Sequence, residues 1–253
     1  MSDLLHDTTP APRIERHRHE LVRRAATVTA LERITPNMLR VTLSGAELAG
    51  FVSSAPDDHI KIFVPDGTGD EAKRDYTPRS FDEASGTLVI DFALHDAGPA
   101  TQWALEAKVG DTLRIGGPRG SQVITGDIDH WVLLGDETAL PAIGRRIEEA
   151  AKGTRITAVI GVTGPQEEQQ FDSAADVSVL YVHRADPADP APMVAALAQV
   201  ALPPRTFVWI AAESTVARAL RSHLLDARGH ALPWLKASGY WVKGEADASD
   251  KGL

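Results

Sequence analysis

Hydrophobic and polar residues alternate in six short segments of the first half of the chain. Such alternation places successive side chains on opposite faces of a β-strand, and turn residues separate the segments. Six short antiparallel strands, with one helix after the fifth, favour a closed barrel over an open sheet. The predicted strands cover residues 26–34, 38–44, 59–64, 74–81, 87–94 and 111–115.

After residue 125 the pattern changes to strands that alternate with helices. This alternation predicts a parallel sheet with helices on its faces. We therefore expect a barrel domain over residues 19–124 and an α/β domain over 125–245, with polar, flexible tails at 1–18 and 246–253. The predicted strands are residues 130–135, 155–162, 177–183, 206–211 and 240–243, and the predicted helices are 141–152, 191–200 and 215–228.

One segment of the first half carries a dense set of polar and aromatic groups, Arg74-Asp75-Tyr76-Thr77-Pro78-Arg79. On a strand Arg74 and Tyr76 project to one face, and Thr77 and Arg79 project to the other. An aromatic ring beside fixed hydrogen-bond donors suits a flat cofactor that carries phosphates. The alternative is an edge strand with solvated arginines.

A second segment follows, in which a strand ending in Asp91-Phe92-Ala93-Leu94-His95 leads to Gly98-Pro99-Ala100-Thr101-Gln102-Trp103. The Gly-Pro turn predicts a helix start, where free backbone N–H groups and the helix dipole attract an anion such as a diphosphate. An ordinary turn capped by Thr101 is the alternative, and His95 has the alternative of a structural role at the strand end.

These two segments are followed by three further motifs in a fixed order, Gly116-Gly117-Pro118-Arg119-Gly120-Ser121, Gly135-Asp136-Glu137-Thr138-Ala139-Leu140-Pro141-Ala142-Ile143 and Gly239-Tyr240-Trp241-Val242-Lys243-Gly244. Together they resemble the siderophore-interacting proteins over roughly residues 20–245. That family consists of FAD-dependent ferric-siderophore reductases related to the ferredoxin-NADP reductases. The resemblance implies an N-terminal six-stranded antiparallel flavin-binding barrel and a C-terminal parallel-sheet domain that binds NADPH or NADH.

The resemblance also implies roles for particular residues. We expect the isoalloxazine and ribityl-phosphate region of FAD to contact Arg74, Tyr76, Thr77 and Arg79. The rest of FAD would be framed by Asp91, Phe92, Leu94, His95, Gly98, Ala100 and Thr101. In the family, the segment that corresponds to Asp136-Glu137-Thr138-Ala139 faces the flavin and the incoming nicotinamide. The alternative role of these residues is helix capping ahead of Pro141.

Ligands of an open parallel sheet bind at the carboxyl ends of its strands. The Gly-x-Gly-x-x-Gly fingerprint of conventional dinucleotide-binding proteins is missing there. Arg184 is a candidate for the 2′-phosphate of NADPH, with help from Thr163, and Glu213 for the nicotinamide end. A solvated loop arginine and an exposed helix cap are the alternatives for Arg184 and Glu213, so the choice between NADPH and NADH stays open.

The chemistry that the family performs is electron transfer from a nicotinamide through FAD to chelated Fe(III), which needs no protein acid or base. Iron arrives within the siderophore, so we predict no resident metal site. The candidates for binding an anionic ferric chelate are Lys61, Arg119 and Lys243, and Lys236 is a weaker one. Ordinary solvated surface cations are the alternative for each.

Composition limits the remaining possibilities. The content of 43% hydrophobic and 24% charged residues is that of a soluble globular protein. No apolar run reaches the length of a membrane span, and the N-terminus lacks a signal-peptide pattern, so we expect a cytoplasmic monomer without membrane insertion. The absence of cysteine excludes disulfides, thiol catalysis and thiolate-bound iron–sulfur clusters.

The net charge of −9 argues against nucleic acid as a partner, because binding phosphates along a strand needs a basic face. Two functions other than a ferric-siderophore reductase remain open. One is a general NAD(P)H-flavin reductase that serves another acceptor. The other is a noncatalytic siderophore-binding protein that keeps the same fold.

Overall fold

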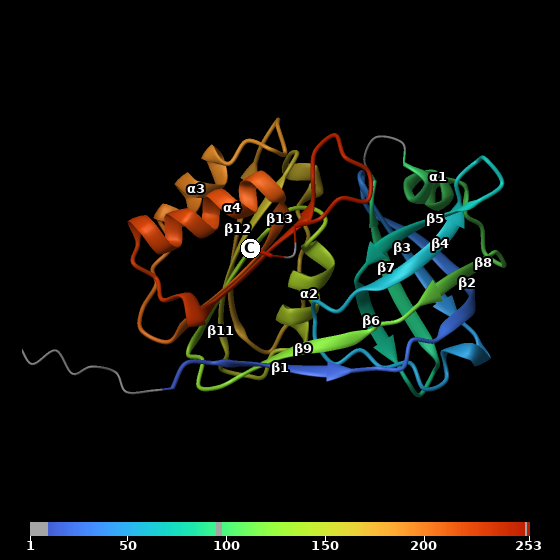
Figure 1. Cartoon of the computed structure of the whole chain (residues 1–253), viewed down its shortest axis with the longest axis horizontal. Coiled ribbons are helices and arrows are strands. Elements are labelled where there is room, and N and C mark those ends of the chain that lie inside the picture. The colour runs from blue at the N-terminus through green and yellow to red at the C-terminus, as the bar shows by residue number, and fades with distance from the viewer. Residues whose placement is uncertain (1–9, 95–97, 251) are drawn as a thin grey trace, which may run out of the picture.

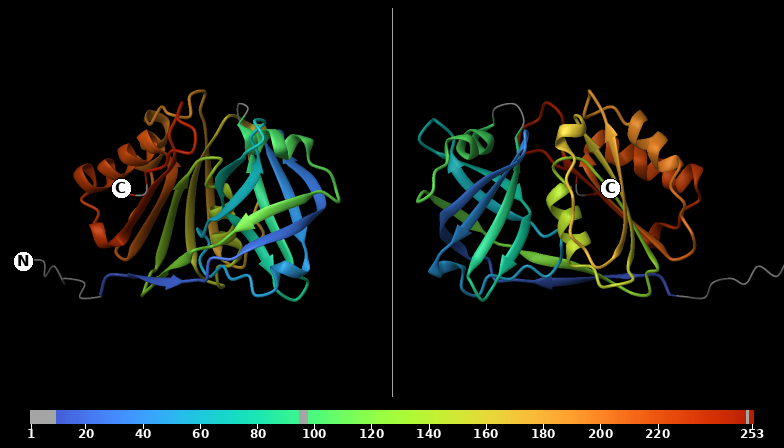
Figure 2. Two further views of the ribbon diagram at one scale, coloured as in Figure 1. Left: turned by 45° about the vertical axis from the view of Figure 1, so that its right-hand side comes forward. Right: turned by 180° about the vertical axis from the view of Figure 1, so that it is seen from behind.

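The computed structural model describes residues 10–94, 98–250 and 252–253, which form two halves packed side by side (Figure 1). Each half is built on its own sheet, and a two-stranded ribbon runs along both of them (Figures 1 and 2). Within the described residues, no helix is long and apolar enough to cross a membrane.

The first half is a curled antiparallel sheet of seven strands with the order β5-β4-β8-β2-β3-β7-β6. Alternate residues such as Val41, Ile62 and Ile90 are fully buried inside the curl, as the period-two pattern predicts. The helix α1 (Pro99–Glu106) follows β7, and a short 3-10 turn, η1 (Ala46–Leu48), follows β3. The strands are β2 (Arg23–Thr35), β3 (Met38–Ser44), β4 (Ile60–Pro65), β5 (Glu71–Tyr76), β6 (Pro78–Asp82), β7 (Thr87–Ala93) and β8 (Thr112–Gly116).

The single strand that the sequence predicts over residues 74–81 is two strands, which is why the sheet has seven strands and not six. The strand breaks at Thr77, directly before Pro78, whose nitrogen has no hydrogen to donate to a neighbouring strand. β5 pairs with β4, whereas β6 pairs with β7 at the other end of the sheet. Thr77 therefore joins the two edges, and the predicted barrel-type fold class is confirmed.

The second half is a parallel sheet of five strands with the order β12-β11-β10-β13-β14, as the alternating pattern predicts. Leu133 and Trp209 face α2 (Leu140–Glu148) on the side toward the barrel, and Val132 and Val208 face the other two helices. The strands are β10 (His130–Gly135), β11 (Arg155–Val162), β12 (Asp176–His183), β13 (Thr206–Glu213) and β14 (Leu235–Trp241). The other helical segments are α3 (Ala191–Ala198), α4 (Ser214–Ser222), η2 (Pro165–Glu167), η3 (His223–Ala227) and η4 (Leu232–Trp234).

Both predicted tails contain ordered pairing, which corrects the expectation for them. β1 (Arg13–Arg18) pairs antiparallel with β9 (Gly120–Thr125) throughout its length. All six of its residues are exposed, so it has no hydrophobic alternation that would reveal a strand. At the other end of the chain, Asp250 pairs with Gly239, and its carboxylate forms an ion pair with Arg218. The last strand begins at Leu235 and not at residue 240.

Polar contacts join the two halves at several points. The buried Glu167 of η2 accepts hydrogen bonds from Thr35 Oγ1 (2.6 Å) and Asn37 Nδ2 (2.9 Å) of the barrel. Arg145 of α2 donates to Ser53 Oγ (2.7 Å) and to the Ser53 carbonyl oxygen (2.9 Å). Because Glu167 and Arg145 of the α/β half each hydrogen-bond to the barrel, the two halves are held in a fixed position relative to each other. A site can therefore be built from residues of both.

Candidate functional site

An aromatic row lies on the barrel at the end of β5. The ring of Tyr76 is 4.4 Å from that of Phe92, which is 5.6 Å from that of Trp103 on α1. Burial raises the pKa of Tyr76 above its usual value, so the phenol stays neutral. Arg74, on the same face of β5, is partly exposed and donates to the Lys73 carbonyl oxygen (2.8 Å).

Behind this row, Arg79 and Asp91 belong to one buried cluster of charges. Asp91 accepts two hydrogen bonds from Arg40, at 2.7 and 2.8 Å, and lies 3.6 Å from Nε of Arg79. Arg79 Nη2 also donates to Glu148 Oε1 of α2 at 2.5 Å. The sequence nominated Arg79 and Asp91 separately. It missed Arg40, although Arg40 stands directly opposite Asp91 in the register of β3 and β7.

Thr77 joins β5 to β6 and is buried. In the sequence it stands between Tyr76 of the aromatic row and Arg79 of the charged cluster. The curl of the sheet brings β5 beside β7, so the structure places near one another the predicted residues Tyr76, Phe92, Thr77, Arg79 and Asp91. Two guanidinium groups and two carboxylates balance the charge of the cluster, so Arg79 is held in place before any ligand is present.

The start of α1 carries the other predicted FAD residues. Gly98 is its N-cap and Pro99 its first residue, and no side chain caps the free N–H groups. A Cβ built on Gly98 would meet no atom within 4 Å, so there is open space beside this helix start. Ala100 and Thr101 are buried, and Leu94, directly after β7, donates its N–H to the Asn37 carbonyl oxygen. His95 lies outside the described residues.

Asp136 connects three strands at the carboxyl edge of the parallel sheet. Its carboxylate is buried and accepts hydrogen bonds from Thr138 Oγ1 (2.6 Å), the Glu213 N–H (2.7 Å) and Trp241 Nε1 (2.9 Å). The alternative role of helix capping is not present, because Ala139 is the N-cap of α2 and no side chain caps that helix; the Thr138 N–H donates to Asp136 (2.9 Å) within the turn before it. The link to β13 and β14 was not predicted. Ala139, the N-cap of α2, is fully buried.

Arg184 and Glu137 form an ion pair at the same edge, with 2.5 Å between Nη2 and Oε2. Arg184 is 4% exposed and is therefore not a solvated loop residue, and its buried Nη1 has no hydrogen-bond partner. Burial and the nearby Asp136 carboxylate raise the pKa of Glu137 to about 7, against the opposing effect of Arg184. Thr163, on the loop after β11, is exposed.

Glu213 is not the exposed cap that was its alternative reading. It is buried, and its carboxylate caps α4 by accepting from the N–H groups of Thr215 (2.6 Å) and Val216 (3.2 Å). The same carboxylate accepts from the Lys243 N–H at 3.3 Å. Glu213 therefore ties the C-terminal segment to the carboxyl edge of the sheet.

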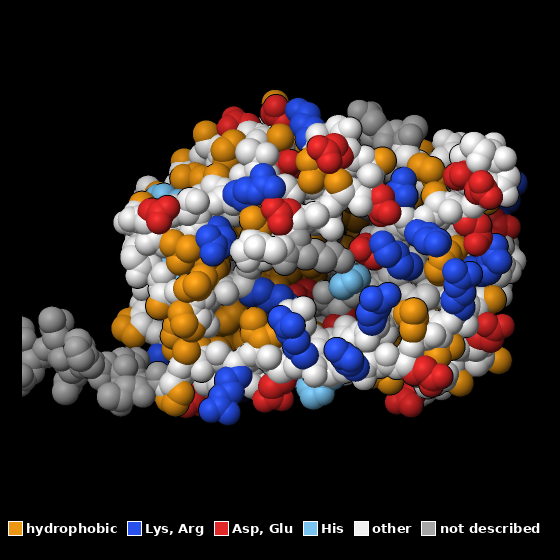
Figure 3. Space-filling model, viewed as in Figure 1, with side chains coloured by type: hydrophobic (Ala, Val, Ile, Leu, Met, Phe, Trp, Pro, Cys, Tyr) orange, Lys and Arg blue, Asp and Glu red, His pale blue; other side chains and the backbone are white. Residues whose placement is uncertain are grey.

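The predicted chelate-binding cations do not form one cluster. Lys61 forms an ion pair with Asp75 (3.1 Å), Lys243 with Asp186 (2.8 Å) and Lys236 with the partly buried Asp57 (2.5 Å). Arg119 is exposed and has no side-chain partner among the described residues. Figure 3, which is viewed as in Figure 1, shows Lys and Arg side chains gathered on the face of the barrel turned to the viewer, beside a hollow between the halves.

The sequence analysis names Lys236 as a weak candidate but does not name its partner, Asp57. Burial opposes ionisation of Asp57, but Lys236 and the indole N–H of Trp209 (3.1 Å) hold its pKa below the usual value. The two residues are 179 positions apart, so no local pattern could reveal their contact. They join the barrel to β14 on the inner face of the parallel sheet.

Comparisons with known proteins agree with this two-part architecture. The family described as "Siderophore-interacting protein" matches residues 128–244, and the "Siderophore-interacting FAD-binding domain" matches residues 27–73 and 69–122. The chain is 32% identical to an NADPH-dependent ferric-chelate reductase from Escherichia coli, over 90% of the chain and 96% of that protein. It is 28% identical to the ferric vibriobactin reductase ViuB from Vibrio cholerae, over 84% of the chain and 86% of that protein.

Among solved structures, a siderophore utilization protein from T. fusca has a similar fold over nearly the whole chain. Its TM-score is 0.87 at 35% sequence identity, and the alignment covers 96% of this chain and all of the other. The matches span both halves described above, and the resemblance inferred from the five motifs is confirmed. The chain belongs to the siderophore-interacting protein family.

Proposed function

We propose that this protein is a ferric-siderophore reductase that holds FAD on the barrel and accepts electrons from a nicotinamide dinucleotide at the parallel sheet. The observation that carries the proposal is the contact between Arg79 of the barrel and Glu148 of α2. This contact joins the charges behind the aromatic row to Glu148, the last residue of α2, and α2 is the helix that follows the carboxyl edge of β10. The proposed flavin-binding surface and the proposed nicotinamide-binding half are therefore held against each other through α2.

The residues present fit both cofactors. The uncapped start of α1 with its open space at Gly98 suits a diphosphate, and the orphaned Nη1 of Arg184 suits a phosphate oxygen. FAD, when bound, accepts two electrons as a hydride and returns them singly, which Fe(III) requires. Reduction favours release, because hard oxygen ligands hold Fe(III) more strongly than Fe(II).

The chain's own residues would bind and orient. Tyr76 is partly exposed and offers an uncharged aromatic surface to a flat ring, the fully buried Phe92 packs against it, and Arg79 holds a fixed cation behind them. Asp136 fixes the edge from which a nicotinamide would approach. No side chain is needed to transfer a proton to the iron chelate. We further propose that the enzyme acts as a cytoplasmic monomer.

The purified protein is expected to be yellow and to contain noncovalent FAD. A visible spectrum, followed by heat release and chromatography of the flavin, measures this directly. Anaerobic mixing with NADPH should bleach the flavin, and a ferric siderophore should restore the colour. A colourless protein that does not bind added FAD would contradict the proposal, whereas bleaching that only other acceptors reverse would favour a general flavin reductase.

The double variant Lys61→Ala/Arg119→Ala is expected to raise KM for an anionic ferric chelate and to flatten its salt dependence, because a screened attraction is removed. Asp75 already neutralises much of the Lys61 charge, so Arg119→Ala alone should account for most of the change. Stopped-flow measurement separates the two half-reactions. Equal damage to flavin reduction by NADPH would mean that the pair supports the flavin or the fold instead.

Glu137 is expected to make NADPH binding dependent on pH. Below a pKa of about 7 its carboxyl group is neutral and leaves Arg184 free for a phosphate, and above it the carboxylate competes for the same guanidinium. From about pH 6 to pH 8, KM for NADPH should therefore rise up to about tenfold more in the wild type than in Glu137→Gln. The titration of the 2′-phosphate itself cancels in this comparison. Equal pH profiles would remove Arg184 from phosphate recognition.

A further inference from the structure

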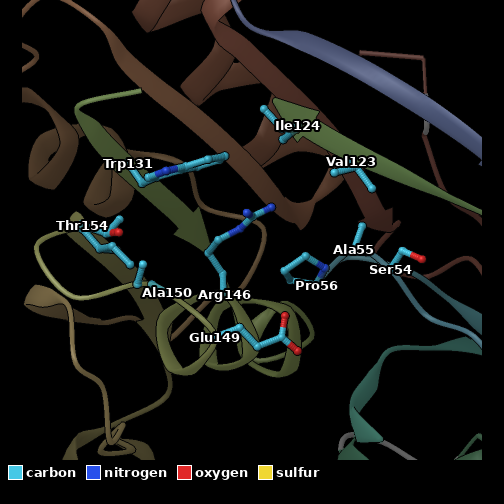
Figure 4. A pocket seen from close by; sticks show the side chains of 12 residues that line it. Ser54, Ala55, Pro56, Val123, Ile124, Trp131, Arg146, Glu149, Ala150 and Thr154 are labelled. Atoms are coloured by element: carbon cyan, nitrogen blue, oxygen red, sulfur yellow. The ribbon is translucent and has the colours of Figure 1, made fainter. Parts of the chain in front are cut away.

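A cavity of about 280 Å³ lies at the opposite edge of the parallel sheet from the carboxyl ends. It is lined by Trp131 at the start of β10, Ile156 at the start of β11, the last turn of α2, Val123 and Ile124 of β9, and Pro56 of the barrel (Figure 4). Trp131 and Asp136 are five residues apart on an extended strand, which is about 16 Å. The cavity is therefore separate from the proposed cofactor site.

Arg146 of α2 extends into this cavity and stacks on the indole of Trp131, with 4.3 Å between the guanidinium carbon and the ring centroid (Figure 4). Its guanidinium has no hydrogen bond and no ion pair with any of the described residues. Burial lowers the pKa of Arg146 from its usual value, because the guanidinium has lost water without gaining a hydrogen-bond acceptor.

The cations around Arg146 each have a carboxylate of their own. Arg145 is paired with Glu149 (2.6 Å), Arg79 with Glu148 (2.5 Å) and Lys236 with Asp57 (2.5 Å). Asp57 and Glu149 also attract Arg146, and Glu149 lines the cavity beside it, but each carboxylate already has this closer partner. One positive charge is therefore left over, on a guanidinium whose donors point into a lined cavity.

We propose that this cavity binds a small carboxylate with an apolar body, held by Arg146. A guanidinium fork matches the two oxygens of a carboxylate, whereas Val123, Ile124, Ile156 and Pro56 offer an apolar wall that a hydrated inorganic ion would not use. Since one water occupies about 30 Å³ of liquid, the cavity has roughly the volume of nine waters. That volume suits a carboxylate with a single ring or a short alkyl chain.

The cavity also takes residues from both halves, because Ser54, Ala55 and Pro56 belong to the barrel and Arg146 to the α/β half. A ligand there would contact both at once and add to the polar contacts that join them. The site is independent of the proposed function, because no residue that lines it has been placed near either cofactor.

Benzoate is the probe for this site, and calorimetric titration of the FAD-containing protein measures its binding. We expect one saturable site, and benzamide, which has the same ring but no charge, should bind at least about tenfold more weakly. Saturating NADP⁺ should leave benzoate affinity unchanged. Absence of benzoate binding, equal binding of benzamide or competition by NADP⁺ would each overturn the proposal.

The variant Arg146→Gln should lose about tenfold or more in benzoate affinity, and Arg146→Lys, which keeps the charge without the fork, should fall between. Arg155→Gln is the matched control, because Arg155 is exposed, begins β11 and does not line the cavity. Flavin content and the thermal midpoint show whether each variant is folded. Undiminished binding by Arg146→Gln, or inorganic phosphate binding as well as benzoate, would contradict the assignment.

Discussion

Replacing Arg79 by alanine is expected to weaken FAD retention by about 1.5–3 kcal/mol, or roughly 10- to 150-fold, if its guanidinium makes a charge-assisted hydrogen bond to the cofactor. Arg79 is 6% exposed and is fixed between Asp91 and Glu148, so it offers its remaining donors at little entropic cost. Titration of the flavin-free protein with FAD measures the change.

Two variants separate cofactor binding from the structural role of this residue. Arg114→Ala removes another barrel arginine with an ion pair, to Glu71, but at an exposed position, and should leave FAD affinity unchanged. Glu148→Gln keeps Arg79 and removes only its charged partner on α2, so it should retain FAD. If Arg79→Ala lowers stability and keeps its FAD affinity, Arg79 is a link between the halves and not a cofactor ligand.

Replacing Asp136 by alanine is expected to lower the free energy of unfolding by about 3–5 kcal/mol, because several buried donors lose a charged acceptor together. These donors come from the loop after β10, from β13 and from the side chain of Trp241 in β14. Urea unfolding followed by tryptophan fluorescence measures the loss.

Asp127→Ala is the matched control for this variant, since Asp127 is an exposed aspartate with no partner among the described residues, and its change should be within about 0.5 kcal/mol. Asp136→Asn keeps the shape of the side chain but replaces one acceptor oxygen by a donor, so an intermediate loss is expected. A loss in Asp136→Ala no larger than that of the control would show that water replaces the carboxylate at this edge.

Much of the fold follows from local patterns. The predicted strand over residues 38–44 coincides with β3, because its alternating residues face a core on one side only. β1 could not be predicted, since all of its side chains are exposed and backbone hydrogen bonds to β9 alone define it. The division of residues 74–81 into two strands depends on where the sheet curls. Pro78 indicates a break, but it does not show that the two parts pair with different neighbouring strands.

The sequence predicts which residues belong to the site, but it does not predict which of them contact one another. Arg79 and Asp91 were found through the family motifs, but their joint ion cluster depends on Arg40 and Glu148 from two other elements. The pairing of Arg184 with Glu137 and of Lys236 with Asp57 joins residues far apart in the chain. Tertiary structure creates such pairs, so neither member carries a sequence signal for the other.

The ribbon of β1 and β9 affects how far the two halves can move. The segment that leads from β8 to β10 is the covalent connection between them, and a single extended segment would bend easily. β1 pairs with it along Gly120–Thr125, and His19, directly after β1, is hydrogen-bonded to Ser121 Oγ of β9 at 2.8 Å. The connection is therefore a stiffened hinge, so that electrons would pass between cofactors held at a nearly constant separation, without a wide opening and closing of the molecule in each turnover.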